Sequence, residues 1–246
     1  MALLDRELRR DKRPITELWA PTQDTPEQQT VSLLDETPWS IGDGAARVRV
    51  KCAPGALSWQ SRERLSRLSV PVLLDFNCSA TNDEEVLELV AGVSAVAIVD
   101  AVEQPFAVGN VVDHARLAAR LDVNVSLDEG VRSMRDLAQI DRYKAAAMVC
   151  VKPARVGGLA NARTMILRAN DLGLRVYLGG FFESPYARRV HRALANSCVR
   201  EPSDLAAVGV SAHEEAATIS SSFGAEPSVL VLEEAECLPV LSQDGP

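Results

Sequence analysis

The feature that most constrains this 246-residue chain is a regular alternation of short apolar runs with amphipathic stretches. From about Val48 onward the apolar runs are "ARVRVKC", "VPVLLDFN", "AVAIVDAVEQP", "VNVSLDEG", "AAMVCVKP" and "LRVYLGG". Between them stand "SRERLSRL", "NDEEVLELVAGV", "VVDHARLAARL", "SMRDLAQIDRY" and "LANARTMILRANDLG", whose apolar residues recur at three- and four-residue spacing. Strand, helix and strand in repeated succession predict a parallel α/β sheet with crossover helices.

The number of runs favours a barrel. An earlier run, "TVSLLDE", and a weaker later one near residues 196–199 add two expected strands to these six. The total matches a (β/α)8-type barrel, for which a length of about 250 residues is typical. A doubly wound open sheet is the alternative, but the chain has no glycine-rich dinucleotide fingerprint.

The two ends of the chain differ from its middle. "MALLDRELRRDKRPITELWA" predicts a helix, and the proline- and glutamine-rich "PTQDTPEQQ" after it predicts an irregular linker. The alternation degrades from about Ser211 through "SSSFGAEP", and "VLVLEEAECLPVL" indicates one late strand. We therefore expect a helix and linker over residues 1–30, the barrel over 31–210 and a C-terminal segment over 211–246.

Composition excludes several classes of protein. The net charge is -8 without any basic block, which argues against a nucleic-acid or anionic-membrane partner. The start, "MALLDRELRRDKR", lacks the apolar core of a signal peptide, and no segment approaches eighteen uncharged residues, so we expect a cytoplasmic protein. The five cysteines are far apart and never form a C-x-x-C pair, which predicts free buried thiols rather than disulfides or a zinc site.

Polar side chains stand where five successive apolar runs end. Side chains two apart on a strand face the same way, and the carboxyl ends of parallel barrel strands converge on one mouth. The residues placed there are Arg49, Lys51, Asp75, Asn77, Glu103, Asp128 and Lys152. We expect them to form one site at that mouth.

Three of these residues are acids, which repel one another unless lysines or a cation neutralise them. Asp75, Glu103 and Asp128 offer the hard oxygen ligands that Mg²⁺ or Mn²⁺ prefers over zinc. One such acid alone is typical of a helix cap or a surface position, whereas three acids on successive strands favour a cation-binding site. Lys152 ends an apolar run, and an ammonium there needs a partner or a reaction to offset its desolvation.

The segments "EQPFAVGNVVDHARLAARL", "LDEGVRS", "VKPARVGGLANA" and "GGFFESP" together resemble the enolase superfamily. The resemblance covers most of residues 45–205 and is closest to the muconate-lactonizing group, in its o-succinylbenzoate synthase and N-acylamino acid racemase branch. It implies a (β/α)7β TIM-like barrel. It also implies an Mg²⁺ (or Mn²⁺) site and catalytic lysines that match two motifs, K-x-K and K-P-x-R-x-G-G. The implied metal ligands are Asp75, Glu103 and Asp128, and the implied catalytic lysines are Lys51 and Lys152.

The implied reaction removes the α-proton of a small carboxylate substrate. Lys51 would act as the base, with its pKa lowered by neighbouring cations. Lys152, across the substrate, would return a proton in a racemisation or hold the anion while a β-hydroxyl leaves in a dehydration. Both outcomes share the first step. The positions expected to bind substrate are Arg49, Asn77, Gly179, Glu183 and Ser184.

The chain departs from the family pattern in two ways. The K-x-K motif reads "RVK", and Arg49 keeps a permanent charge but cannot transfer protons near neutral pH. We also expect the family's α+β capping domain to be missing, since "LLDRELRRDKRPITELW" resembles the helix that follows it. Truncation, a cap from another chain and a function that tolerates an open mouth all remain open, and we expect a homo-oligomer or a partner chain over the mouth.

Two other functions compete with this one. Loss of the cap favours a non-catalytic scaffold or subunit that needs a cap-supplying partner, whereas the retained acids and lysines favour an enzyme. A barrel aldolase would use Lys152 as a Schiff base and needs no carboxylates. The run Arg188, Arg189, His191 and Arg192 predicts a solvated helix face or a cationic rim, and His114 and His213 are expected at the surface.

Overall fold

The computed structural model describes residues 7–8, 10–13, 19, 21, 25–32, 39, 41, 44–55, 57–181, 183 and 185–205. The chain divides into two compact units, Met1–Ala20 with Gly209–Pro246, and Pro21–Val208. In the first unit Glu7, Leu8 and Arg10 are helical, and the chain then turns at Asp11 and Lys12, where Lys12 has a positive φ of 51°. A turn therefore follows the helical residues inside the helix expected over 1–20. The strand expected in "VLVLEEAECLPVL" lies outside the described residues.

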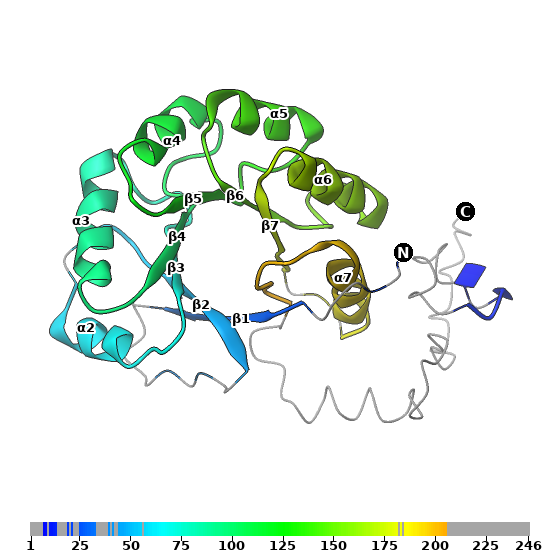
Figure 1. Cartoon of the computed structure of the whole chain (residues 1–246), viewed down its shortest axis with the longest axis horizontal. Coiled ribbons are helices and arrows are strands. Elements are labelled where there is room, and N and C mark those ends of the chain that lie inside the picture. Colours follow the sequence, from blue (N-terminus) through cyan, green and yellow to red (C-terminus); the bar gives the residue numbers. More distant parts are fainter. Residues whose placement is uncertain are drawn as a thin grey trace, which may run out of the picture. The chain divides into compact units, whose positions relative to one another are not determined.

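The second unit is built on seven parallel strands paired in sequence order. Figure 1 shows them as one curled sheet with α2 to α6 on its outer side. The six apolar runs and the earlier run are therefore confirmed as strands, although the first begins at Glu27, inside the expected linker. The strands are β1 (Glu27–Ser32), β2 (Ala45–Lys51), β3 (Val72–Asp75), β4 (Val99–Glu103), β5 (Asn124–Leu127), β6 (Met148–Val151) and β7 (Arg175–Leu178).

The helices follow the predicted amphipathic stretches. Three of them start at a side-chain cap, where Ser58, Asn82 and Ser133 accept a hydrogen bond from the backbone N–H three residues on. The expected strand near residues 196–199 is wrong, because α7 occupies this segment up to Cys198. The helices are α2 (Trp59–Ser66), α3 (Asp83–Ser94), α4 (Val111–Ala118), α5 (Met134–Tyr143), α6 (Leu159–Asp171) and α7 (Pro185–Cys198).

Side-chain alternation divides the interior into two apolar layers. One buried cluster joins the strands to the surrounding helices and includes Val48, Val50, Leu74, Val86 and Val102. A second, smaller cluster of residues from the opposite strand faces consists of Leu73, Ala101, Met148, Cys150 and Tyr177. The strand residues that alternate with the first cluster therefore line the inside of the curled sheet.

A short segment after α7 links the last strand to the first. The Ser203 carbonyl accepts a hydrogen bond from Gln28 N–H of β1 (3.0 Å), and Ser203 N–H donates to Pro26 O (2.9 Å). On the other side, Asp204 N–H donates to Leu178 O of β7 (3.0 Å), and Ser203 Oγ accepts from Leu178 N–H (3.0 Å). These two residues thus bridge β7 and β1 beyond the segment 196–199 in which we expected an eighth strand, and we call them the seam.

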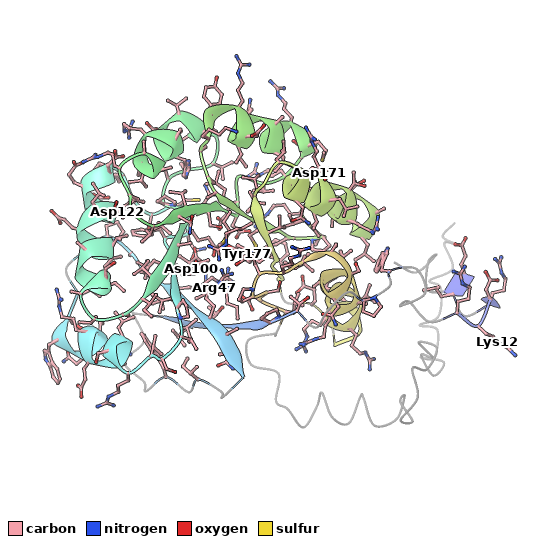
Figure 2. The ribbon with its side chains drawn as sticks, viewed as in Figure 1. Lys12, Arg47, Asp100, Asp122, Asp171 and Tyr177 are labelled. Atoms are coloured by element: carbon pink, nitrogen blue, oxygen red, sulfur yellow. The ribbon has the colours of Figure 1, made fainter. Side chains whose placement is uncertain are left out.

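A buried ion network occupies the amino-terminal end of the strands. Arg47 is 1 % exposed and donates to Gln28 Oε1 (2.5 Å), Asp100 Oδ2 (2.9 Å) and the carbonyl of Pro202 (2.8 Å). Its guanidinium also lies 4.9 Å from the centre of the Tyr177 ring. Figure 2 shows Arg47, Asp100 and Tyr177 inside the curl of the sheet. Within the described part of the chain, no helix is long and apolar enough to cross a membrane.

Candidate active site

Five neighbouring strands present a charged side chain at their carboxyl ends. Lys51, Asp75 and Glu103 are the last residues of β2, β3 and β4, whereas Asp128 and Lys152 directly follow β5 and β6. The register pairs Lys51 with Asp75 and Asp75 with Glu103, so these side chains stand at one level. The order across the sheet is therefore lysine, three acids, lysine, with all but Lys51 buried.

Asp75 is held by its own turn and by Lys51. Its Oδ2 accepts from Lys51 Nζ (3.0 Å), and its Oδ1 accepts from the backbone N–H of Asn77 (3.0 Å). Asn77 and Cys78 both have positive φ values, 45° and 64°, an uncommon conformation for residues other than glycine. The turn brings Asn77 Oδ1 to 2.7 Å from Lys51 Nζ, so two predicted site residues do meet here.

Asp128 carries two cationic partners although it is 1 % exposed. Lys152 Nζ donates to its Oδ2 (2.8 Å), and Arg155 NH1 donates to its Oδ1 (2.5 Å). Burial alone would raise the pKa of Asp128, but Lys152 and Arg155 outweigh it and lower that pKa. Arg155 was not predicted as a site residue, although it is the arginine of the K-P-x-R motif.

Glu103 lies between these two acids and is fully buried. Its Oε1 accepts from Arg49 NH1 (3.1 Å), and its Oε2 has no hydrogen-bond partner among the described residues. Burial, followed by the charge of Asp75, raises the pKa of Glu103 to about 8, against the lowering effect of Arg49. A buried carboxylate oxygen without a partner is costly, which makes Glu103 the least satisfied of the three acids.

Arg49 binds more than Glu103. Its side chain is 7 % exposed, and NH2 pairs with Asp204 Oδ2 of the seam while Nε donates to Thr30 Oγ1 (3.3 Å). The Thr30 hydroxyl also donates to Asp204 Oδ2 (3.0 Å). Neither Thr30 nor Asp204 was predicted as a site residue. Asp204 follows "EPS", which has no strand pattern, so the sequence offered no signal for it.

The acids fit a divalent cation. Among the described residues, carboxylate oxygens of Glu103 and Asp128 and the sulfur of Cys150 all lie within 4.8 Å of one another. Burial raises the pKa of the Cys150 thiol well above its ordinary value, which leaves the carboxylate oxygens as the ligands. A cation would also give Glu103 Oε2 the partner that it lacks. Asp75 lies outside this group, with its Oδ2 turned toward Lys51 Nζ (3.0 Å).

The loop after β7 lies against Lys152. A Cβ atom at Gly179 would stand 2.5 Å from Cys150 Sγ and 2.8 Å from Lys152 Cε, so only glycine leaves room for that lysine. The ring of Phe181, 48 % exposed, lies 4.9 Å from Lys152 Nζ and 5.4 Å from Arg155 Cζ. Glu183 Oε1 accepts from Phe181 N–H (2.6 Å). Ser184 lies outside the described residues.

The histidines, α7 and the cysteines differ in part from the expectations. His114 is buried, not at the surface, and its ring bonds the Asn110 carbonyl at 2.8 Å and the Phe106 N–H at 3.3 Å. The solvated face expected for α7 is wrong for two of its members, because Arg188 and His191 are buried. His213 and Cys237 lie outside the described residues. The four described cysteines are free as expected, but only Cys52 and Cys150 are fully buried.

Comparison with known proteins agrees with this geometry. A family described as enolase C-terminal domain-like matches residues 44–220, more than half of the chain. A member of the enolase superfamily from Enterococcus faecalis superposes with a TM-score of 0.70 at 25% identity, over 83% of this chain and 57% of that one. A probable mandelate racemase from Alicyclobacillus acidocaldarius gives 0.68 at 29% identity, over 83% and 55%.

Curated relatives carry two names. An N-succinylamino acid racemase from Amycolatopsis is 29% identical over 208 residues, which are 80% of this chain and 55% of that protein. An o-succinylbenzoate synthase from Enterococcus faecalis is 27% identical over 79% of this chain and 55% of its own length. The chain thus spans about half the length of these relatives. Fold, family match and relatives agree with the resemblance seen in the motifs, and the chain belongs to the enolase C-terminal domain-like family.

Proposed function

We propose that this chain is the barrel of a divalent-metal-dependent lyase or isomerase that abstracts the α-proton of a carboxylate substrate. The observation that carries the proposal is the order of side chains along the sheet, in which Lys51 and Lys152 flank Asp75, Glu103 and Asp128. A base on each side of a bound substrate allows a proton to leave from one face and return to the other. The names of the relatives support the same class of reaction.

Each of these charged groups then has a role in the proposed reaction. Asp75, Glu103 and Asp128 would hold Mg²⁺ or Mn²⁺. A bound divalent cation supplies Lewis-acid stabilisation of the negative charge that develops on the substrate carboxylate. Lys51 takes the proton from the α-carbon once its ammonium has lost a proton and its bond to Asp75. Its side chain is 42% exposed, which leaves its nitrogen accessible to substrate.

Lys152 is placed to act on the opposite face. It is buried against Asp128, and although burial lowers the pKa of Lys152, the charge of Asp128 and the hydrogen bond that Lys152 donates to it raise that pKa. A lysine that stays protonated donates a proton to the α-carbon in a racemisation of N-succinylamino acids. In a dehydration of the o-succinylbenzoate synthase type, it stabilises the anion instead. The raised pKa argues against the aldolase alternative, since a Schiff-base lysine needs a lowered one.

The first test is calorimetric titration with Mg²⁺ and Mn²⁺, comparing the natural protein with Asp128→Asn. We expect the substitution to abolish binding, because it removes a ligand and leaves Lys152 and Arg155 beside a neutral amide. Glu129→Gln, at the next residue, is the control. Absence of binding by the natural protein would contradict the metal-dependent mechanism.

The second test follows the α-proton directly. Exchange of the α-proton of D- and L-N-succinylamino acids is measured by NMR in D₂O with Mg²⁺ present. Lys51→Met and Lys152→Met should each abolish exchange for one enantiomer more strongly than for the other, because each lysine faces one side of the α-carbon. Lys144→Met, which removes an exposed lysine paired with Asp141, should leave exchange unchanged. Formation of o-succinylbenzoate is assayed separately, and full retention of both activities in both lysine variants would refute the assignment.

A further inference from the structure

Arg49 occupies a position at which its charge competes with any cation bound by Glu103. One nitrogen of its guanidinium, NH1, lies 3.1 Å from Glu103 Oε1 and 3.7 Å from Asp75 Oδ2, so it reaches two of the three acids. Each acid has at least one cationic partner: Lys51 and Arg49 for Asp75, Arg49 for Glu103, and Lys152 with Arg155 for Asp128. Arg49 differs from the two lysines because it cannot lose its charge near neutral pH.

Arg49 is not free to give all its hydrogen bonds to Glu103. Its second terminal nitrogen, NH2, pairs with Asp204, and its Nε donates to the Thr30 hydroxyl. That hydroxyl in turn fixes Asp204 Oδ2 at 3.0 Å. A guanidinium presents its donors in a rigid plane, so the bond to Asp204 determines how the remaining nitrogen faces Glu103. The unpartnered Glu103 Oε2 is the result, since Arg49 engages only Oε1.

From these contacts we infer that Asp204 is a positioning residue for the metal site. By pairing with NH2 of Arg49, Asp204 prevents a bidentate ion pair between Arg49 and Glu103 and keeps Glu103 Oε2 available to a divalent cation. Without the Asp204 carboxylate, Arg49 would turn both terminal nitrogens to Glu103 and compete with the cation. The inference rests on the proposed metal site, but it concerns the balance between Arg49, Asp204 and Glu103.

Substitutions at the two partners of the Arg49–Asp204 ion pair should therefore change Mn²⁺ affinity in opposite directions. Asp204→Asn should weaken Mn²⁺ binding by about 10- to 100-fold, as is common when an outer partner of a metal ligand is lost. Arg49→Met should instead tighten binding, because Glu103 loses its internal counter-ion. A merely structural role would move both variants in the same direction, since either substitution breaks the same buried pair.

The experiment is calorimetric titration of the whole chain with Mn²⁺, after circular dichroism has shown that each variant is folded. Asp100→Asn is the matched control, because Asp100 pairs with Arg47 of the same strand at the opposite end of the sheet. It should leave Mn²⁺ affinity unchanged. Where Arg49→Met does not fold, Arg49→Gln replaces it. The glutamine amide can still hydrogen-bond but carries no charge, so Glu103 again loses its counter-ion and we expect tighter binding there too.

A double variant separates positioning from simple charge. In an Arg49→Met background, Asp204→Asn should weaken binding less than it does in the natural protein. An equal effect in both backgrounds would mean that the Asp204 charge acts directly on the cation, and the inference would be overturned. Unchanged or weaker binding in both Arg49 variants would overturn it as well.

The outcome for the metal site can be distinguished from the outcome for Asp204. If the natural protein binds no Mn²⁺ but Arg49→Met does, the metal-dependent function fails for this chain while the competition by Arg49 stands. If the natural protein binds Mn²⁺ and the Arg49 variants bind no more tightly, the function stands and the inference fails. Binding by none of these proteins would refute both.

Discussion

Gly179→Ala tests whether the fit between β6 and the loop after β7 sets the position of Lys152. The added Cβ would lie 2.5 Å from Cys150 Sγ and 2.8 Å from Lys152 Cε, distances that real Cβ contacts essentially never show. Both neighbours are on one strand face, and Cys150 is fully buried. Overpacking of this kind lowers the free energy of unfolding by about 1 to 3 kcal/mol. We expect a loss in that range, measured by urea denaturation.

The contacts of the added Cβ with Cys150 and with Lys152 should have different consequences. Cys150 cannot move, so its contact should determine the loss of stability, whereas the flexible Lys152 side chain yields and carries its ammonium away from Asp128. Adding Cys150→Ala to Gly179→Ala should therefore recover much of the stability but little of the α-proton exchange. Gly44→Ala is the control, because a methyl group at Gly44 would meet nothing within 4 Å and should change stability by less than about 0.5 kcal/mol. A Gly179→Ala variant as stable and active as the natural protein would refute the packing argument.

Other predictions concern the rest of the molecule. Arg47→Met should lower the free energy of unfolding by about 3 kcal/mol in urea denaturation, since it breaks a buried pair, whereas Arg67→Met, at an exposed pair, should change it by less than about 1 kcal/mol. Burial lowers the pKa of His114 below its ordinary 6.5, so the unfolded chain binds the proton more readily. Its contribution to stability is therefore lost as pH falls below about 6.5, and His114→Gln should reduce that dependence in melts recorded from about pH 7.5 to 5. Equal slopes in both proteins would contradict this reading. Phe181→Ala should remove a cation–π contact that stabilises the Lys152 ammonium by about 0.5 to 1 kcal/mol, and it should therefore shift the pH profile of α-proton exchange. Phe181→Tyr keeps an aromatic ring and should not shift it.

The predicted site depended on the points at which apolar runs end. Asp75, Glu103 and Asp128 each interrupt a hydrophobic strand, and the period of two places them on the face of Arg49 and Lys51. Their positions along the chain were thus predictable. The ion pairs of these acids were not predictable, because the partners of a side chain depend on the neighbouring strands and on its rotamer. The alternation of apolar and polar residues contains neither.

Asp204 and the burial of His114 were missed for different reasons. Asp204 lies in a seam of two residues, which is too short to show any periodicity, yet backbone bonds to β1 and β7 place it beside Arg49. His114 could have been found, since it precedes Leu117 by three residues and both are buried on one face of α4. Its polar side chain is tolerated there because both ring nitrogens have backbone partners.

The seam has a consequence for motion. Few hydrogen bonds join Ser203 and Asp204 to their neighbours, whereas β1 and β2 pair over six residues. Segments with few such bonds open at lower free energy than the strands around them. In hydrogen exchange, the amides of Ser203 and Asp204 should therefore lose protection before those of β3 and β4. Each opening would withdraw the carboxylate that binds Arg49, so the Arg49 guanidinium would briefly lose its fixed orientation while the sheet stays folded.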